Sequence, residues 1–237
     1  MTPQHPLVTY PGTALADNLE QRDWARTLVA STGRAIMPRN SQPEHAWNTQ
    51  RQVYLVIDCS NSMSRKDKMP QARRGALLFA REARNKGYLV GLISFASEAR
   101  HILEPAENLE SLASALACMK AGKGSTNMAH AIQVAREHLA RERGERVCVL
   151  VTDGQPDDEK ATLTEAAQAK HIGVEIMTIG TDDADKAYLE QLASRHELSA
   201  KVASHELEQG MFTMARMLPM LPAPKCIGAT TPRLPQL

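Results

Sequence analysis

The chain has 237 residues, of which 43% are hydrophobic and 23% are charged, and its formal net charge is +1. This composition is ordinary for one globular domain with extensions, and the near-neutral charge gives no general attraction to nucleic acid or to a membrane surface. No apolar stretch approaches the roughly 18 residues of a membrane-spanning helix, and the start of the chain lacks the basic and apolar regions of a secretory signal. We therefore expect a cytoplasmic protein that binds neither nucleic acid nor membrane.

Residues 1–50 are expected to form an N-terminal extension. Within it, residues 14–30 are compatible with one helix, because apolar side chains recur there at loose helical spacing. Residues 38–48 are polar and rich in turn formers. The extension is interpreted as a segment that packs on the main domain or on a partner.

The first strong signal is a run of apolar residues, 53–57, that leads into an acid. Such a run predicts a strand buried on both faces in the middle of a parallel sheet. Asp58, Ser60 and Ser62 then follow at every second position. Open α/β sheets bind their ligands at the carboxyl ends of the strands, and carboxylate and hydroxyl oxygens are ligands for Mg²⁺, Mn²⁺ or Ca²⁺. A turn without an ion is the simpler alternative, since Asp and Ser are common turn residues.

Residues 68–86 have the apolar spacing of a helix that ends at Gly87. Basic residues are frequent from Arg65 to Lys86, which indicates either a solvated surface or a basic docking face. Residues 88–95 predict the next buried strand. Residues 100–103, bounded by Pro105, predict a short edge strand, and residues 108–119 a short helix.

A glycine-rich loop, residues 121–127, precedes the next helix. It lacks the G-x-x-x-x-G-K-[ST] spacing of a phosphate-binding P-loop. Three interpretations stay open: an anion site at the helix N-terminus, a helix cap by Ser125 or Thr126, or a Thr126 hydroxyl directed at an ion held by Asp58.

Residues 147–151 repeat the first pattern, because a buried strand again runs into an acid, Asp153. Adjacent parallel strands lie about 4.8 Å apart, so neighbouring strands would bring Asp58 and Asp153 face to face. Two close carboxylates repel each other and one takes up a proton, unless a cation lies between them. The repetition therefore favours a divalent cation over a plain turn.

The rest of the chain continues the alternation of helices and strands. A helix at 159–171, a strand at 174–179, a helix at 185–195 and a short strand at 198–202 are expected. Ser204 is expected to cap a final helix that reaches residue 218. Residues 219–237 contain several prolines and predict a flexible tail.

The cysteines lie at Cys59, Cys118, Cys148 and Cys226 without a C-x-x-C pair, which argues against a disulfide framework. Cys148 falls in an expected buried strand, where a thiol behaves as a small hydrophobic group. None of the eight histidines forms an H-x-x-x-H pair, so the spacing does not indicate a zinc site.

Together these elements predict an α/β fold: a doubly wound, mainly parallel, Rossmann-like sheet with helices on both faces and one short antiparallel edge strand. Three polar motifs fall at its strand ends and loops: Asp58-x-Ser60-x-Ser62, Gly124-Ser125-Thr126 and Thr152-Asp153-Gly154. In this order they resemble the von Willebrand factor A (vWA) domain family and its metal-ion-dependent adhesion site, in its intracellular bacterial form. The resemblance covers about residues 51–218, with 1–50 and 219–237 as extensions outside it.

The resemblance implies that Ser60, Ser62 and Thr126 bind a divalent cation through their hydroxyls, and that Asp58 and Asp153 bind it directly or through water. Mg²⁺ is expected, with Mn²⁺ or Ca²⁺ as alternatives. In this family a partner's carboxylate fills the remaining position, which implies a non-enzymatic, metal-dependent protein–protein interaction module. Intracellular bacterial members often work with AAA+ ATPases of the MoxR type, so an adaptor for such an ATPase is the implied role.

The alternative is a Mg²⁺-dependent phosphatase or hydrolase that uses the Asp58/Asp153 site. Phosphatases of the haloacid dehalogenase type need a second carboxylate two residues after the first, where this chain has Ser60. Ser62 has no His nearby in the sequence to activate it. A dinucleotide-binding enzyme would need G-x-G-x-x-G after the first strand, and residues 59–64 contain no glycine.

Overall fold

The computed structural model describes residues 50–122, 124–182 and 184–220. Within them, six strands form one sheet in the order β3-β2-β1-β4-β5-β6. The strands are β1 (Arg51–Asp58), β2 (Tyr88–Phe95), β3 (Ala99–Ala106), β4 (Arg146–Thr152), β5 (Val174–Thr181) and β6 (Ser199–Val202). The helices are α1 (Lys68–Asn85), α2 (Leu109–Cys118), α3 (Met128–Leu139), α4 (Glu159–His171), α5 (Lys186–Leu192) and α6 (Leu207–Met217), with 3₁₀ turns η2 (Asn61–Ser64), η3 (His196–Leu198) and η4 (Ser204–Glu206). The helix expected at 14–30 and residues 221–237 of the expected tail lie outside the described residues.

The sheet is built around β1, which pairs in parallel with β2 on one side and β4 on the other. All eight of its residues are buried, as its unbroken apolar run predicts for a strand covered on both faces. β5 extends the parallel sheet beyond β4, and β6 ends it. The prediction of four interior parallel strands is therefore confirmed.

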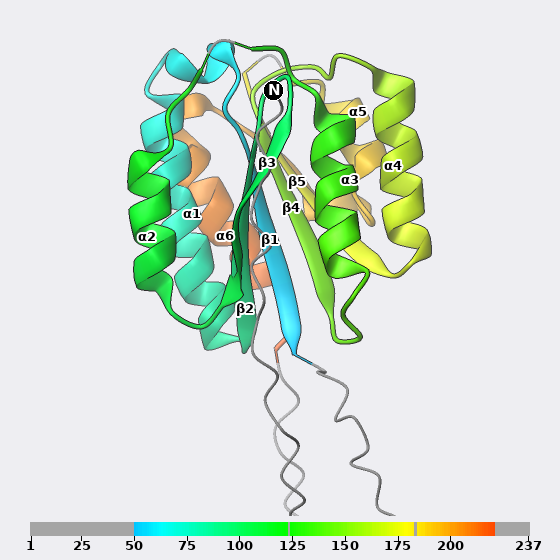
Figure 1. Cartoon of the computed structure of the whole chain (residues 1–237). Helices are drawn as coiled ribbons and strands as arrows, with labels where there is room; N and C mark the ends of the chain where they lie inside the picture. Colours follow the sequence, from blue (N-terminus) through cyan, green and yellow to red (C-terminus); the bar gives the residue numbers. More distant parts are fainter. Residues whose placement is uncertain (1–49, 123, 183, 221–237) are drawn as a thin grey trace, which may run out of the picture. The chain divides into compact units, whose positions relative to one another are not determined.

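Helices cover both faces of the sheet (Figure 1): α1, α2 and α6 lie on one face, and α3, α4 and α5 on the other. Because side chains alternate along a strand, β1 supplies both cores. Val53, Leu55 and Ile57 pack against the first set of helices. Tyr54 and Val56 pack against the second set. The expected α/β fold with helices on both faces is confirmed.

The edge strand β3 is antiparallel to β2, as predicted, but it is not short. It has eight residues and includes Pro105, which was expected to end it. Proline lacks an N–H donor, and an edge strand tolerates this because one side of its backbone has no neighbouring strand. The register between β2 and β3 shifts twice, between Val90 and Leu92 and between Leu92 and Ile93.

Polar side chains at the helix starts explain several boundaries. The side chains of Asn108, Asp158 and Asp185 accept hydrogen bonds from backbone N–H groups in the first turns of α2, α4 and α5. Ser204 does not act as the expected cap of the last helix, because it lies in η4 and α6 begins only at Leu207. Its hydroxyl instead accepts a bond from Thr181 Oγ1 (3.3 Å) and bonds to Asp182.

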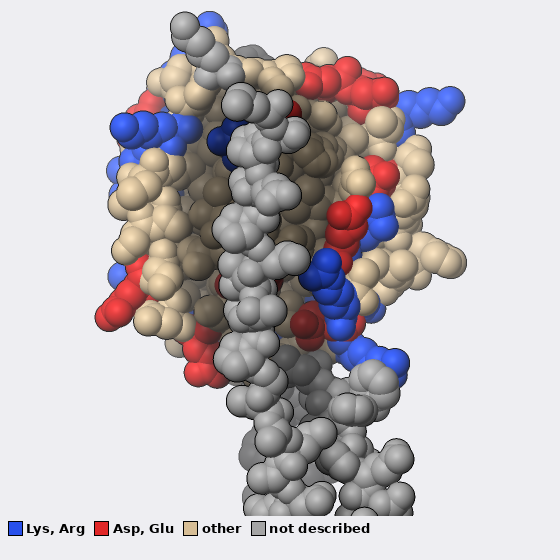
Figure 2. Space-filling model, viewed as in Figure 1, with Lys and Arg blue, Asp and Glu red and all other residues tan. Residues whose placement is uncertain are grey.

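The carboxyl ends of the parallel strands and the loops that follow them gather at one edge of the sheet, the upper edge in Figure 1. On the face shown in Figure 2, acidic and basic side chains are interspersed, and neither sign covers the face. Among the described residues, no helix is both long and apolar enough to cross a membrane.

Candidate metal centre

The predicted ligands from β1 and β4 form one hydrogen-bonded network at the carboxyl edge. The Ser60 and Ser62 hydroxyls lie 2.9 Å apart, and the Ser62 hydroxyl donates to Asp153 Oδ1 (2.6 Å). Asp58 joins the same network, because its Oδ1 accepts from the Ser60 N–H at 2.7 Å. The two acids thus end neighbouring parallel strands, as expected from the repeated pattern of a strand followed by an acid.

Asp58 is enclosed on all sides, with an exposed fraction of 0%. Its Oδ2 accepts a hydrogen bond from Thr152 Oγ1 (2.7 Å), a residue of the third motif that had no role assigned to it. Burial raises the pKa of Asp58 to about 6; bonds from Ser60 and Thr152 act against the rise, and the charge of Asp153 adds to it. A cation close to this carboxyl would favour its charged form.

Asp153 is equally buried, and a lysine occupies its second oxygen. Lys68 Nζ lies 2.6 Å from Asp153 Oδ2 and 3.0 Å from Asp182 Oδ2, and the Lys68 side chain is only 3% exposed. Burial lowers the pKa of Lys68, but the two carboxylates outweigh this effect, and the net pKa is raised. A bond from Ser204 and then the ammonium groups of Lys68 and Lys66 hold the pKa of Asp182 at about 2. The site therefore holds two carboxylates, Asp153 and Asp182, around one buried ammonium.

Thr126, the fifth predicted ligand, lies on the loop before α3 and faces the loop that carries Asp153. A methyl group added at Gly154 would lie 3.8 Å from Thr126 Oγ1. The two loops are joined by a reciprocal pair of bonds: Thr126 N–H donates to Asp157 Oδ1 (2.9 Å), and Asp157 N–H donates to the Thr126 carbonyl (3.0 Å). No local motif around Asp157 indicates this role. Asn127, and not Ser125 or Thr126, caps α3, since its side chain accepts from His130 N–H (3.1 Å).

Backbone hydrogen bonds hold the three loops of the site together. Cys59 N–H donates to the Phe95 carbonyl (2.6 Å), and Gly122 N–H donates to the Cys59 carbonyl (2.8 Å). Asn127 N–H donates to the Ala96 carbonyl (2.8 Å). The loops after β1 and β2 and the loop before α3 are therefore connected through their backbones, which places Thr126 beside the two strand ends.

The donor set fits a hard divalent cation. Three hydroxyls and two carboxylates are oxygen ligands of the kind that Mg²⁺ and Ca²⁺ prefer. The Lys68 ammonium offsets only part of the negative charge of Asp58, Asp153 and Asp182, so the site still favours a cation. Lys68 and Asp182 were not identified as parts of the site, because no local motif links them to Asp153 and only the packing of α1 brings the ammonium there.

Most of the basic residues from Lys68 to Lys86 have partners within the domain. Arg73 donates to the Met119 carbonyl, Arg84 to the Tyr88 carbonyl and Lys86 to the carbonyl of Leu218. Arg74 pairs with Glu208 (2.8 Å). These contacts assign much of the basic helix to structural roles rather than to a free docking face.

A groove of about 490 Å³ adjoins the site between β3 and α2, and Cys59 and Gly122 form the end beside the strand-end acids. Its lining includes Ile102, which is 43% exposed, and the exposed cations Arg100 and Lys120. The groove also contains Glu98, so its charge is mixed with an excess of positive groups.

Several known proteins resemble this chain in sequence or in fold. The chain is 27% identical over 150 residues to the thrombospondin-related anonymous protein of Plasmodium falciparum, and the match covers 58% of this chain and 27% of that protein. The chain thus spans about a quarter of this curated relative. The fold is similar to that of the pilus adhesin SpaC from Lactobacillus rhamnosus GG, at a TM-score of 0.64 and 18% identity, covering 71% of this chain and 30% of SpaC.

Two further solved structures have the same fold. Proximal thread matrix protein 1 from the mussel byssus, in a form with a zinc-occupied MIDAS motif, matches with a TM-score of 0.62 and 19% identity, over 70% of this chain and 47% of that protein. The conserved hypothetical protein BatB from Bacteroides thetaiotaomicron matches with a TM-score of 0.57 and 18% identity, over 70% of this chain and 99% of that chain. Residues 52–212 match the family model for the von Willebrand factor type A domain, and the chain therefore belongs to the von Willebrand factor type A domain family.

Proposed function

We propose that this protein is a non-enzymatic interaction module that binds a divalent cation through Asp58, Ser60, Ser62, Thr126 and Asp153 and docks an Asp or Glu of a protein partner on it. The observation that carries the proposal is the network at the ends of β1 and β4, in which the Ser60 N–H and the Ser60 and Ser62 hydroxyls link two fully buried carboxylates. A bound cation would supply a Lewis-acidic anchor for the partner's carboxylate. The chain's own residues would hold the cation and limit its contact with water.

Mg²⁺ is the proposed metal, because every ligand is a hard oxygen and Mg²⁺ commonly keeps places for water that a partner's oxygen can take. Mn²⁺ and Ca²⁺ are alternatives with similar ligand preferences. The mussel protein with a zinc-occupied MIDAS motif supports the idea that a site of this type holds a divalent metal. The adjoining groove supports an acidic partner segment, because Arg100 and Lys120 lie along it.

The geometry of the site favours binding over catalysis. Both oxygens of Asp58 already accept hydrogen bonds, and its side chain is inaccessible to solvent, so it is poorly placed to attack a phosphate ester. Lys68, the cation nearest to the network, is held in its charged form by two carboxylates. It therefore has no free lone pair with which to remove a proton from Ser62.

The partner proposal rests on the resemblance to intracellular bacterial vWA proteins. In that setting the protein would work in the cytoplasm as an adaptor for an AAA+ ATPase of the MoxR type. The pilus adhesin and the other relatives support the broader class of protein–protein interaction.

The test is binding of a partner by the full chain in Mg²⁺ and in EDTA. A MoxR-type ATPase from the same host is the first candidate, and affinity capture from host lysate supplies others. We expect EDTA, Asp58→Ala and Thr126→Ala each to weaken binding at least about tenfold, on the order of 1.4 kcal/mol. Ser64→Ala is the control and should leave binding unchanged, since Ser64 lies in the same turn as Ser62 but its side chain bonds only to the Asn61 carbonyl (2.7 Å) among the described residues.

Binding that survives both EDTA and Asp58→Ala would contradict the proposal and place the interface elsewhere. The same preparations should also be assayed with p-nitrophenyl phosphate. Metal-dependent turnover that Asp58→Ala abolishes would support the hydrolase instead.

A further inference from the structure

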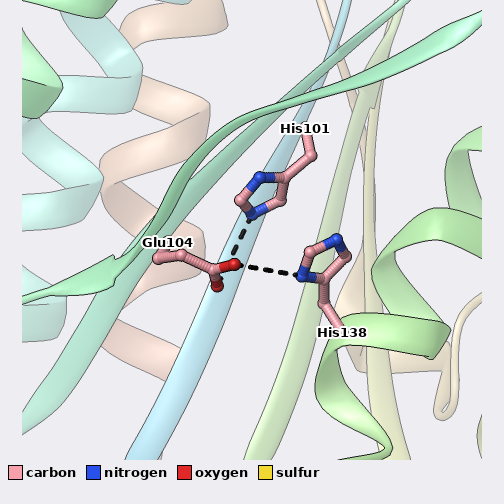
Figure 3. Close-up of side chains that lie close together, drawn as sticks. All are labelled: His101, Glu104 and His138. Carbon is pink, nitrogen blue, oxygen red and sulfur yellow. Dashed lines mark ion pairs between the residues drawn. The ribbon is translucent and has the colours of Figure 1, made fainter. Parts of the chain in front are cut away.

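A second group of metal-ligating side chains lies away from the strand-end site. His101 and Glu104 come from β3, and His138 comes from the last turn of α3. Figure 3 shows the three side chains directed toward one another from these two elements. Their ligand atoms all lie within 4.8 Å of one another. We propose that His101, Glu104 and His138 form a binding site for a zinc-class transition-metal ion.

The irregular pairing of β3 explains how two of the ligands share one face. Residues three apart on a regular strand point to opposite faces. Ile93 and Leu92 are neighbours on β2. Their partners on β3, His101 and Leu103, are two residues apart, so β3 has one extra residue here. This extra residue is a β-bulge, which redirects the side chains beyond it. The side chains of His101 and Glu104 therefore lie on the same face of β3, and the Tyr54 hydroxyl contacts both of them, at His101 Nε2 (2.9 Å) and Glu104 Oε2 (2.8 Å).

The distances are close to those of a metal site. His101 Nε2 lies 3.6 Å from Glu104 Oε2, and His138 Nδ1 lies 3.4 Å from Glu104 Oε1. Zinc bonds of about 2.0–2.1 Å in a tetrahedron place neighbouring ligand atoms roughly 3.3 Å apart. With one ligand atom from each residue, the three atoms lie within 4.8 Å of one another, so side-chain rotation has to bring them closer before they bond one ion.

The two imidazole rings must tilt when a metal binds. In the structure they are stacked, with centroids 3.9 Å apart and planes at 4°. A nitrogen lone pair lies in the plane of its ring, so parallel rings cannot both point at one ion between them. Rotation about the last side-chain torsion of each histidine is soft, and it would open the pair toward Glu104.

The surroundings suit an open, accessible site with three protein ligands. The side chains of His101 and His138 are 23% and 22% exposed, and that of Glu104 is 69% exposed. Two histidines and one carboxylate with a free fourth position form a zinc-binding set. Tyr54 is 1% exposed, and its hydroxyl would hold the Glu104 carboxylate in place as an outer hydrogen-bond partner.

This site is separate from the strand-end site. Tyr54 lies four residues before Asp58 on β1, which corresponds to about 13 Å along the strand. The two sites also differ in their ligands. Imidazole nitrogens suit zinc-class metals, whereas the oxygen-only set at the strand ends suits Mg²⁺ or Ca²⁺. The inference therefore does not depend on the proposed function.

The experiment titrates the full chain with ZnCl₂ in the presence of excess Mg²⁺. The protein carries no histidine tag, and isothermal titration calorimetry measures the binding. The same titration is made with Asp58→Ala, which removes the strand-end site. We expect both proteins to bind one zinc ion with the same affinity. His101→Asn, His138→Asn and Glu104→Gln should each weaken that binding tenfold or more, while His205→Asn, at a histidine with an 81% exposed side chain, should leave it unchanged.

Circular dichroism of each variant checks that it is folded, and Glu104→Gln is the safeguard because the exposed Glu104 side chain contributes little to packing. Co²⁺ provides a second measurement: intense visible bands of a tetrahedral ion should appear in the parent and vanish in His138→Asn. Zinc binding that is unchanged in the His101, Glu104 and His138 variants overturns the proposal. Loss of zinc in Asp58→Ala alone also overturns it, since the ion would then occupy the strand-end site.

Discussion

The Lys68 side chain links α1 to the strand-end site. Its ammonium lies between Asp153 and Asp182 and is nearly excluded from solvent. A buried charge without a partner lowers the stability of the folded protein by several kcal/mol. Asp153 therefore needs a cation nearby. Lys68 supplies one from within the chain, and a bound metal ion would supply another.

We predict that Lys68→Met lowers the stability of the metal-free protein by about 3–5 kcal/mol, because Asp153 is left buried without a counter-charge. Mg²⁺ should then raise the melting temperature of this variant more than that of the parent, since the ion binds a site that no ammonium shares. Thermal unfolding in EDTA and in a Mg²⁺ series measures both effects.

Lys66→Met is the matched control, because Lys66 also contacts Asp182 (3.3 Å) but its side chain is 68% exposed. It should change stability by less than about 1 kcal/mol. A Lys68→Met protein that is as stable as the parent in EDTA and gains nothing extra from Mg²⁺ would show that the ammonium does not compensate Asp153.

Helices α1 and α6 approach each other closely at Gly75. A methyl group added there would lie 2.7 Å from Met211 Sδ and 3.0 Å from the Glu208 Cα atom. The first neighbour is a flexible side chain that can move, but the second is backbone. The glycine therefore allows α6 to pack on α1, and this packing covers one face of the sheet.

We predict that Gly75→Leu lowers the stability of the protein by about 1–3 kcal/mol, the usual cost of overpacking. This loss occurs although leucine has a better helix propensity than glycine. Arg81→Leu places the same residue at an exposed position of α1 and should shift stability by no more than about 0.5 kcal/mol. Urea unfolding of both variants measures the difference. Equal urea midpoints for the two variants would contradict this prediction, because they would mean that α1 and α6 can move apart at Gly75 without a loss of stability.

In the described part of the chain, both hydrophobic cores are formed by residues between Val53 and Leu218. Arg51 connects the two ends of this region. It lies over the Tyr88 ring at 5.1 Å, pairs with Glu145 and donates to the Pro219 carbonyl at 3.0 Å. Arg51 thereby holds residues 219 and 220 against the domain, just beyond the expected boundary at residue 218.

We predict that a fragment of residues 50–220 unfolds cooperatively, with a midpoint within a few degrees of the full chain, because it keeps both cores and the contacts of Arg51. A shorter fragment, 53–217, loses Arg51 and Pro219 and should be measurably less stable. Thermal unfolding of the three proteins tests the domain boundaries. If the full chain is more stable than the 50–220 fragment by over about 2 kcal/mol, the residues outside the fragment contribute to the core and the predicted boundaries are wrong.

The sequence alone determined the central strands, the fold class and the residues placed at the strand ends. These features depend on local patterns: an unbroken apolar run indicates a strand covered on both faces, and the acids that follow 53–57 and 147–151 must then lie at the same edge of a parallel sheet. The burial of Cys148 follows from the same pattern and is confirmed. The resemblance to the vWA family rested on these motifs, and the family-model match over residues 52–212 confirms the family.

Only the tertiary structure showed which residues surround those ligands. Lys68 meets Asp153 because α1 packs across the sheet, and an ion pair between residues so distant in the sequence has no local signal. Spacing also gave no indication of the histidine pair, since His101 and His138 come from a bulged edge strand and a separate helix. The pairing register of an edge strand and the packing of helices depend on long-range contacts, and for this reason periodicity, caps and motifs did not predict them.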